Sequence, residues 1–182
     1  MREPLTTDSL ESFMKALAAT TKSPARVYLV GGASAVLLGW RTATIDVDLK
    51  INPETDEILR RLPELKERLK INIELASPDD FIPPLPGWQE RSQFIRQEGK
   101  LSFHHYDFYA QALSKIERGH DQDHQDFIRM IDTGLVNPDR LVDLFYSIEN
   151  ELYRYPDLDR NSFRQAVELA VAAAKVRLRK PE

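Results

Sequence analysis

The sequence contains no cysteine, and this absence removes several functions at once. Disulfide bonds, thiolate nucleophiles and cysteine-bound zinc all need cysteine, and its absence is consistent with a cytosolic protein. The chain also lacks any apolar run near the roughly 18 residues that a membrane span requires. Residues 1–4 have no signal-peptide character. We therefore expect a cytoplasmic protein with no membrane partner.

An excess of positive charge is missing as well, since the formal net charge is −4 at pH 7. This balance argues against a general nucleic-acid coat protein, although a local basic patch could still contact RNA. No internal repeats or low-complexity tracts interrupt the 182 residues. A chain of this length can bury a substantial core, so we expect a single compact unit.

A glycine pair, Gly31-Gly32, follows a short apolar strand predicted at residues 27–30. The next residues, rich in Ala, Val and Leu, should begin a helix. Backbone N–H groups at such a turn attract phosphate oxygens, and the Ser34 hydroxyl could add another donor. A glycine pair after a strand is also a common tight turn, so phosphate binding and plain turn formation both remain open.

Two aspartates, Asp46 and Asp48, lie on the next predicted strand. The two-residue period of a strand places them on one face and the alternating aliphatic residues Ile45, Val47 and Leu49 on the other, buried face. Carboxylates roughly 6 to 7 Å apart on one face repel each other unless a cation compensates them. Mg²⁺ prefers oxygen ligands and is often held by one or two carboxylates. We therefore predict a Mg²⁺ site here, and the alternative is solvated surface charge.

A third carboxylate could come from either of two later positions. Glu74 stands between apolar neighbours in a strand predicted at residues 71–75, and it is our preferred candidate. Asp107 follows a strand predicted at residues 101–106. Asp107 also fits the N-cap of the helix that should follow it, because an aspartate there accepts a hydrogen bond from the first turn. Both roles stay open for Asp107.

The order of these features resembles the nucleotidyltransferase superfamily that shares the catalytic fold of DNA polymerase β. Its members carry a glycine pair, then an Asp-x-Asp strand, then a further acid on a later strand; here residues 33–45 separate the first two motifs. The resemblance implies a mixed α/β sheet flanked by helices and a nucleoside triphosphate substrate. It also implies two bound Mg²⁺ ions, which Mn²⁺ could replace. It assigns metal binding and catalysis to Asp46, Asp48 and Glu74.

A closer resemblance is to stand-alone nucleotidyltransferase-like proteins related to abortive-infection toxins of toxin–antitoxin systems. It rests on two segments, GGASAVLLGWRTATIDVDL and YDFYAQALSKIERGHDQDHQD. In the second segment, a lysine and an arginine precede the Asp-x-x-Asp element formed by Asp123 and Asp126. The resemblance implies transfer of a nucleoside monophosphate to tRNA or another RNA, and a cognate antitoxin partner. It assigns nucleotide binding to Gly31, Gly32, Ser34, Arg41, Thr44, Lys115 and Arg118.

Two departures limit what the resemblance implies. Arg41 lies one residue further from the aspartates than in those toxins. The tRNA 3′-end-adding enzymes, which have a similar glycine segment, continue into an Arg-Asp pair, whereas this chain has Ser34 and Ala35. The second departure argues against addition of CCA to tRNA.

The predicted helix that carries Lys115 and Arg118 presents them on one face, because they are three residues apart. They could reach the phosphates of a nucleotide or form an exposed surface pair. His120 and His124 would share a face of a continuous helix, but Gly119 should interrupt that helix, so zinc is not expected.

These elements predict a catalytic module at residues 1–107 and a helical C-terminal part at residues 108–182, packed on it. Helices are expected at residues 108–118, 122–133, 138–153 and 160–178, because apolar residues recur there with a helical period. Two further functions remain open beside nucleotidyl transfer. One is a non-catalytic nucleotide-binding or antitoxin-interacting protein, and the other is a metal-dependent hydrolase.

Overall fold

The computed structural model describes residues 3–179 and divides the chain into two compact units. The first unit contains the chain up to Ser77 and the segment Ser92–Tyr106. The second contains Pro78–Arg91 and the chain from Asp107 onward. The segment Pro78–Arg91, expected within the catalytic module, groups with the helical residues, and its first turn contacts the helix Phe108–Arg118.

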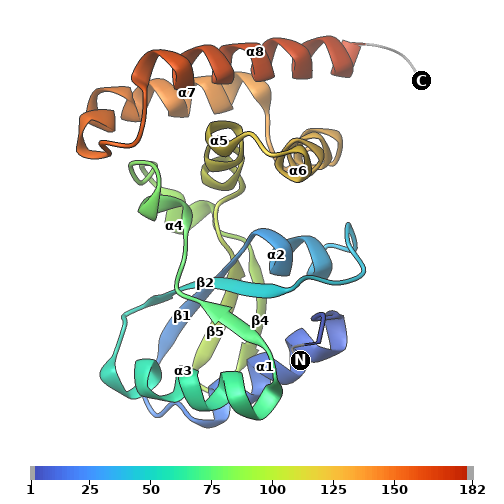
Figure 1. Cartoon of the computed structure of the whole chain (residues 1–182), viewed down its shortest axis with the longest axis vertical. Helices are drawn as coiled ribbons and strands as arrows, with labels where there is room; N and C mark the ends of the chain where they lie inside the picture. Colours follow the sequence, from blue (N-terminus) through green and yellow to red (C-terminus); the bar gives the residue numbers. More distant parts are fainter. Residues whose placement is uncertain (1–2, 180–182) are drawn as a thin grey trace. The chain divides into compact units, whose positions relative to one another are not determined.

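The first unit contains a five-stranded mixed sheet (Figure 1). In spatial order the strands are β3 (Asn72–Glu74), β2 (Asp46–Asn52), β1 (Ala25–Val30), β5 (Leu101–His105) and β4 (Phe94–Glu98). β1 runs antiparallel to β2 and parallel to β5. The edge strand β3 is parallel to β2, and the other edge strand, β4, is antiparallel to β5. The predicted mixed α/β sheet with flanking helices is therefore confirmed.

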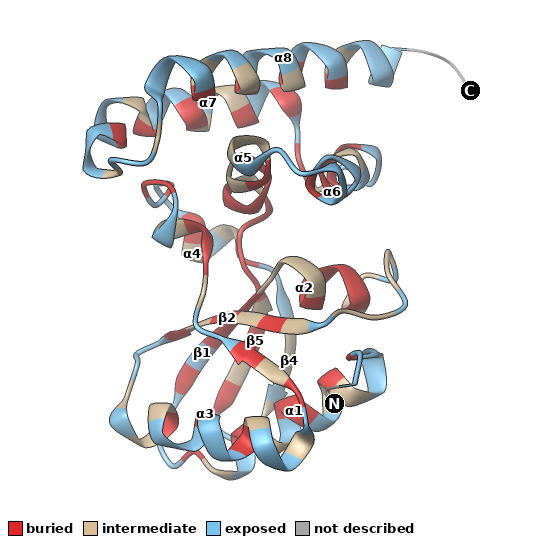
Figure 2. Ribbon diagram, viewed as in Figure 1, coloured by how far each residue is buried: buried red, intermediate tan, exposed pale blue. Residues whose placement is uncertain are grey.

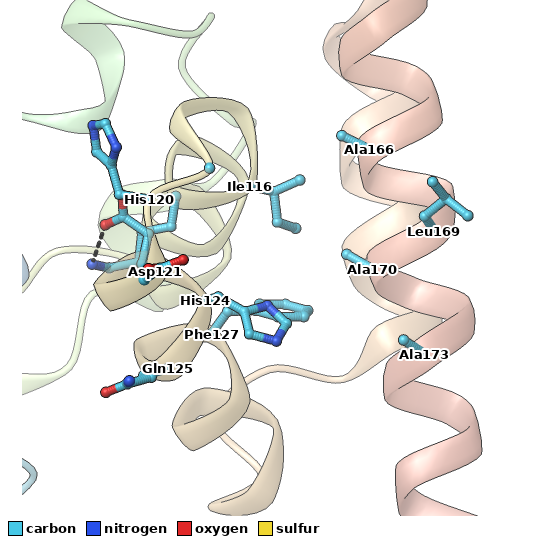
Figure 3. A pocket seen from close by; sticks show the side chains of 13 residues that line it. Ile116, His120, Asp121, His124, Gln125, Phe127, Ala166, Leu169, Ala170 and Ala173 are labelled. Atoms are coloured by element: carbon cyan, nitrogen blue, oxygen red, sulfur yellow. Dashed lines mark hydrogen bonds and ion pairs between the residues drawn. The ribbon is translucent and has the colours of Figure 1, made fainter.

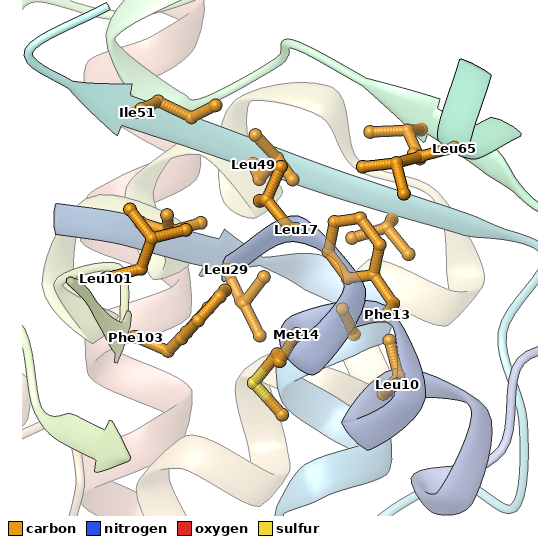
Figure 4. Packing of buried hydrophobic residues seen from close by; sticks show 14 of the residues in the cluster. Leu10, Phe13, Met14, Leu17, Leu29, Leu49, Ile51, Leu65, Leu101 and Phe103 are labelled. Atoms are coloured by element: carbon orange, nitrogen blue, oxygen red, sulfur yellow. The ribbon is translucent and has the colours of Figure 1, made fainter. Parts of the chain in front are cut away.

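One face of the sheet is covered by two amphipathic helices, α1 (Thr7–Ala19) and α3 (Asp56–Leu69). Apolar side chains of the helices, such as Phe13 and Leu65, meet Leu49 and other aliphatic residues of the sheet (Figure 4). Burial of such side chains contributes roughly 1.5 to 3 kcal/mol each. The covered face therefore fixes which residues of β2 point into the core.

The alternation predicted for β2 holds inside the strand and fails just before it. Val47 and Leu49 are buried in the core, and Asp46 and Asp48 are half-exposed on the opposite face. Ile45, predicted to share the buried face, is 71% exposed, so that prediction is wrong. Ile45 lies in a bend before the first residue of β2, where the two-residue period of a strand does not apply.

The second unit is built from helices. Its main elements are α5 (Phe108–Arg118), α6 (Asp121–Asp132), α7 (Pro138–Ile148), the 3-10 helix η2 (Glu149–Arg154) and α8 (Arg160–Arg179). Two short elements, η1 (Pro78–Asp80) and α4 (Trp88–Arg91), precede them. Figure 2 shows the buried residues of α7 and α8 as stripes along one side of each helix, as amphipathic packing requires.

The helices lie where the apolar period predicted them, with the third broken into α7 and η2. Within residues 3–179, no helix combines the length and the apolar character that a membrane span needs.

Candidate active site

The predicted glycine turn leads from β1 into the short helix α2 (Gly31–Leu37). Gly31 has a φ angle of +57°, a backbone conformation that favours glycine. A Cβ atom added at Gly32 would lie 2.1 Å from the Thr44 hydroxyl oxygen and 3.4 Å from Nη1 of Arg41. No side chain fits there unless Thr44 moves. The absence of side chains thus lets the loop before β2 approach the turn closely.

The same turn lies beside one of the two predicted aspartates. Val30, the last residue of β1, pairs with Asp48 on β2. A Cβ atom on Gly31 would be 3.7 Å from Oδ2 of Asp48, which is ordinary contact distance. The structure therefore brings together the glycine turn, Arg41, Thr44 and Asp48, which the sequence analysis selected separately.

Thr44 is held in this position by a short pairing that the sequence analysis missed. Its N–H and carbonyl exchange hydrogen bonds with Leu5, with N···O distances of 2.9 and 2.6 Å. Its hydroxyl also donates to the backbone carbonyl of Asp46 at 3.3 Å. An isolated bridge of this kind leaves no periodic pattern, so no sequence signal could have revealed it.

An acidic edge continues from β2 onto β3. The parallel register pairs Asp46 with Asn72 and Asp48 with Glu74, and directly paired residues of adjacent strands project from the same face. The Asn72 amide nitrogen donates to Oδ1 of Asp46 at 2.6 Å and to Oε1 of Glu74 at 2.8 Å. Asn72 was not selected from the sequence. Its signal was its position two residues before Glu74, which puts both on one face of β3.

The donor set on this edge fits a divalent cation that shares its shell with a ligand. Among residues 3–179, no three His, Asp or Glu side chains are grouped closely enough to hold a metal by themselves. Mg²⁺ does not need such a cage, because it commonly binds one or two carboxylates, several waters and substrate phosphates. Asp46 and Asp48, on one face beside a bare glycine turn, match that pattern.

Ser34, a predicted phosphate contact, is directed into the protein. It is 2% exposed, and its hydroxyl donates to the carbonyl of Leu29 at 3.0 Å. Nδ1 of His105 lies 2.9 Å from the hydroxyl oxygen of Ser34. Burial, together with His104, lowers the pKa of His105 to about 4, so the ring is neutral at pH 7. Because the hydroxyl proton points to Leu29, His105 donates its Nδ1 proton to Ser34. A phosphate contact would require Ser34 to break these bonds.

Lys115 and Arg118 lie in the second unit, in an ion-pair cluster with the Asp-x-x-Asp element. The Lys115 ammonium is 3.2 Å from Oδ1 of Asp123 and 2.7 Å from Oδ2 of Asp126. Arg118 donates to both oxygens of Asp123, at 2.7 and 2.5 Å. Lys115 is only 6% exposed, so the surface-pair alternative is wrong for it. The nucleotide contacts assigned to these two residues stay a prediction.

This cluster changes the acidity of Asp123. Burial alone would raise the pKa of its carboxyl group, but the hydrogen bonds from Arg118 and the charge of Lys115 more than offset burial and hold the pKa below its usual value. Asp123 is therefore ionised at neutral pH, as is needed for a stable buried ion pair.

Asp107, the rival third carboxylate, caps α5. Its Oδ1 accepts a hydrogen bond from the Tyr109 N–H at 3.2 Å, which confirms the N-cap alternative. It is 1% exposed, and Arg91 donates to both of its oxygens, with the shortest contact at 2.6 Å. Arg91 is the last residue of α4, and no sequence pattern indicated that it pairs with Asp107.

A groove of about 680 Å³ in the second unit is bordered by α5, α6 and α8 (Figure 3). His120 and His124 both line it, but His120 is the N-cap residue of α6 rather than part of a continuous helix. Figure 3 shows the His124 ring directed toward α8 and the His120 ring directed away from it.

Together, a mixed α/β sheet, a glycine turn and an adjacent Asp-x-Asp strand define a nucleotidyltransferase-like protein. A family model with the description "Nucleotidyltransferase of unknown function (DUF6036)" matches residues 8–175. The chain belongs to this family. The predicted membership in the nucleotidyltransferase superfamily is thereby confirmed. Neither a curated protein nor a solved structure gives a significant match.

Proposed function

We propose that this protein is a Mg²⁺-dependent nucleotidyltransferase that transfers a nucleoside monophosphate from a nucleoside triphosphate to an acceptor hydroxyl. One observation carries the proposal: the glycine turn lies against Asp48 and the loop of Arg41 and Thr44. The family description supports the nucleotidyl group as the one transferred.

In this reaction the acceptor oxygen bonds to the α-phosphorus, and the bond from that phosphorus to the pyrophosphate oxygen breaks. The backbone N–H groups of Gly31 and Gly32 would hold the triphosphate, with the Arg41 side chain beside them. Asp46 and Asp48 would hold Mg²⁺, or Mn²⁺ in its place. When bound, two such ions neutralise the charge that develops on the transferred phosphoryl group and on departing pyrophosphate. Glu74 would bind the second ion or take the proton of the attacking hydroxyl.

The acceptor is proposed to be tRNA or another RNA, with the protein acting in the cytoplasm as a toxin under control of a cognate antitoxin. This part rests on the resemblance of the two sequence segments to abortive-infection toxins. The nucleotide contacts of Ser34, Lys115 and Arg118 rest on the same resemblance.

The transfer reaction can be tested directly. Purified protein is incubated with Mg²⁺, total cellular RNA and each α-labelled nucleoside triphosphate in turn. We expect label to enter RNA with the wild type, and to fall by at least about 100-fold with Asp46→Asn or Asp48→Asn, because removal of a metal-binding carboxylate removes transition-state stabilisation. Asp157→Asn, an exposed aspartate outside the site, is the matched control and should keep full activity.

The outcome decides between transfer and its alternatives. Full activity in both Asp46→Asn and Asp48→Asn would contradict the assignment. Binding of a nucleotide without turnover would support the second candidate, a non-catalytic nucleotide-binding protein. Release of phosphate without labelled RNA would instead indicate a metal-dependent hydrolase.

A further inference from the structure

Asn72 lies between two of the carboxylates assigned to the metal site. Its single amide nitrogen carries two hydrogens, and each is donated to a different acid, Asp46 at 2.6 Å and Glu74 at 2.8 Å. Asp46 is directly opposite Asn72 in the register of β2 and β3. One neutral side chain therefore links two acids that come from adjacent strands.

These two hydrogen bonds fix the orientation of each carboxylate. The bonds engage Oδ1 of Asp46 and Oε1 of Glu74, so Oδ2 of Asp46 and Oε2 of Glu74 are the oxygens that Asn72 does not contact. Hydrogen bonds to an ionised acceptor are short and roughly twice as strong as those between neutral groups. An amide also reduces the repulsion between the acids without adding a cation that would compete with a metal ion.

The backbone alone does not explain this arrangement. Hydrogen bonds between β2 and β3 already hold the strands in register over Asp46, Val47 and Asp48. The Asn72 side chain is half-exposed at the acidic edge and is absent from the hydrophobic core. Its contribution is therefore expected at the carboxylates rather than in the packing of the sheet.

We propose that Asn72 is a positioning residue that orients Asp46 and Glu74 for divalent-cation binding. This inference rests on the proposed function, because it concerns the same metal site. Partners that orient metal-binding side chains typically contribute 10-fold to 100-fold to metal affinity or activity, so we expect about a 10-fold weaker affinity when the amide is removed.

The test measures Mn²⁺ binding by isothermal titration calorimetry and by electron paramagnetic resonance, without nucleotide. Asn72→Ala removes both donated hydrogens, and we expect its dissociation constant for Mn²⁺ to rise about 10-fold. Asn72→Ser retains one hydroxyl hydrogen and should fall between Asn72→Ala and the wild type. Ser102→Ala is the matched control, a half-buried polar residue of the same sheet that bonds His104, and it should bind Mn²⁺ as the wild type does.

The thermal midpoint of each variant is measured in metal-free buffer, because a purely structural role would lower the midpoint and leave the dissociation constant unchanged. That result, or wild-type affinity in both Asn72 variants, would overturn the positioning role while leaving the metal site intact. Asp46→Asn separates the two proposals. If it binds Mn²⁺ as tightly as the wild type, or if the wild type binds none, the metal site itself fails and the role of Asn72 with it.

Discussion

Two acidic clusters in this protein are built in opposite ways. In the helical unit, Asp123 and Asp126 are buried and form ion pairs with Lys115 and Arg118. In the sheet unit, Asp46 and Glu74 lie at an accessible edge and share the neutral amide of Asn72. The first cluster carries its own compensating cations, whereas the second is oriented by a group without charge.

The difference indicates which acids serve the fold and which can serve a ligand. Buried carboxylates need paired cations, because unpaired charges in the interior cost several kcal/mol. Accessible carboxylates are partly solvated, so the protein can keep them close together without a fixed cation. We therefore interpret the helical cluster as structural and the sheet edge as available for a metal ion. Four substitutions test this difference.

The largest effect is expected from Lys115→Met. The variant removes the cation shared by Asp123 and Asp126 and leaves buried carboxylates only partly compensated. Breaking a buried pair in this way typically costs about 3 to 5 kcal/mol of the free energy of unfolding. Urea unfolding of the variant and the wild type measures the loss.

Lys175→Met is the matched control for this change. Lys175 pairs with Asp139, whose side chain is largely exposed, so its removal should cost less than about 1 kcal/mol. Equal losses in the two variants would show that burial does not distinguish the clusters, and the structural interpretation of Lys115 would be wrong.

The second effect concerns His105, a buried polar group in the sheet unit that has no compensating charge. Its pKa is lowered from 6.5 to about 4 by burial and by His104. Above pH 6.5 the ring is neutral in both the folded and unfolded states. Between pH 6.5 and 4 the unfolded chain takes up a proton that the folded state does not, so stability falls with decreasing pH by about 3 kcal/mol in total.

His105→Gln removes this titration. We expect a flatter dependence of the unfolding free energy on pH between 6.5 and 4, measured by urea unfolding at several pH values, even if the variant is less stable at pH 7. His104, whose pKa burial also lowers, is present in both proteins, so both curves keep the pH dependence that comes from its burial. Parallel curves for the variant and the wild type would contradict the neutral, buried state of His105.

A third, smaller effect tests the glycine turn. The Cβ of Gly32→Ala would lie 2.1 Å from the Thr44 hydroxyl, and overpacking of this kind costs about 1 to 3 kcal/mol. Adding Thr44→Gly removes both atoms that the new methyl group meets first. The double-mutant cycle should therefore show a favourable coupling energy between the two changes, measured by urea unfolding. Strict additivity would mean that the loop does not press against the turn.

The sequence predicted the glycine turn, the Asp-x-Asp strand and the helices because each has a local signal, such as a break in the chain, alternation or a helical period. Prediction from the sequence failed where a contact joins residues that are distant in the sequence. Ser34 was predicted to contact phosphate because it follows the glycine turn, yet its hydroxyl is hydrogen-bonded to His105, which is distant in the sequence. The spacing of Lys115 and Arg118 allowed an exposed surface pair, but Lys115 forms buried ion pairs with two aspartates of α6.

Asn72 shows the same limit within the candidate site. The position of Asn72 two residues before Glu74 indicates a shared face of β3, but only the parallel register of β2 and β3 reveals that Asn72 meets Asp46. Charged residues were easier to select than the neutral residue that orients them, because the repulsion between two acids is visible from spacing alone.

The smallest change in stability is expected from Asp46→Asn, and it is the sharpest test of the comparison. The substitution removes one of the acids whose repulsion the edge must tolerate, and the new amide oxygen can still accept the Asn72 hydrogen bond. We therefore expect the unfolding free energy in metal-free buffer to change by less than about 1 kcal/mol. Asp123→Asn is the matched substitution in the buried cluster, where Lys115 and Arg118 would lose their negative partner, and it should cost several times more. If Asp46→Asn destabilises the protein as much as Asp123→Asn does, then the sheet edge is part of the folded architecture rather than a site kept for a cation.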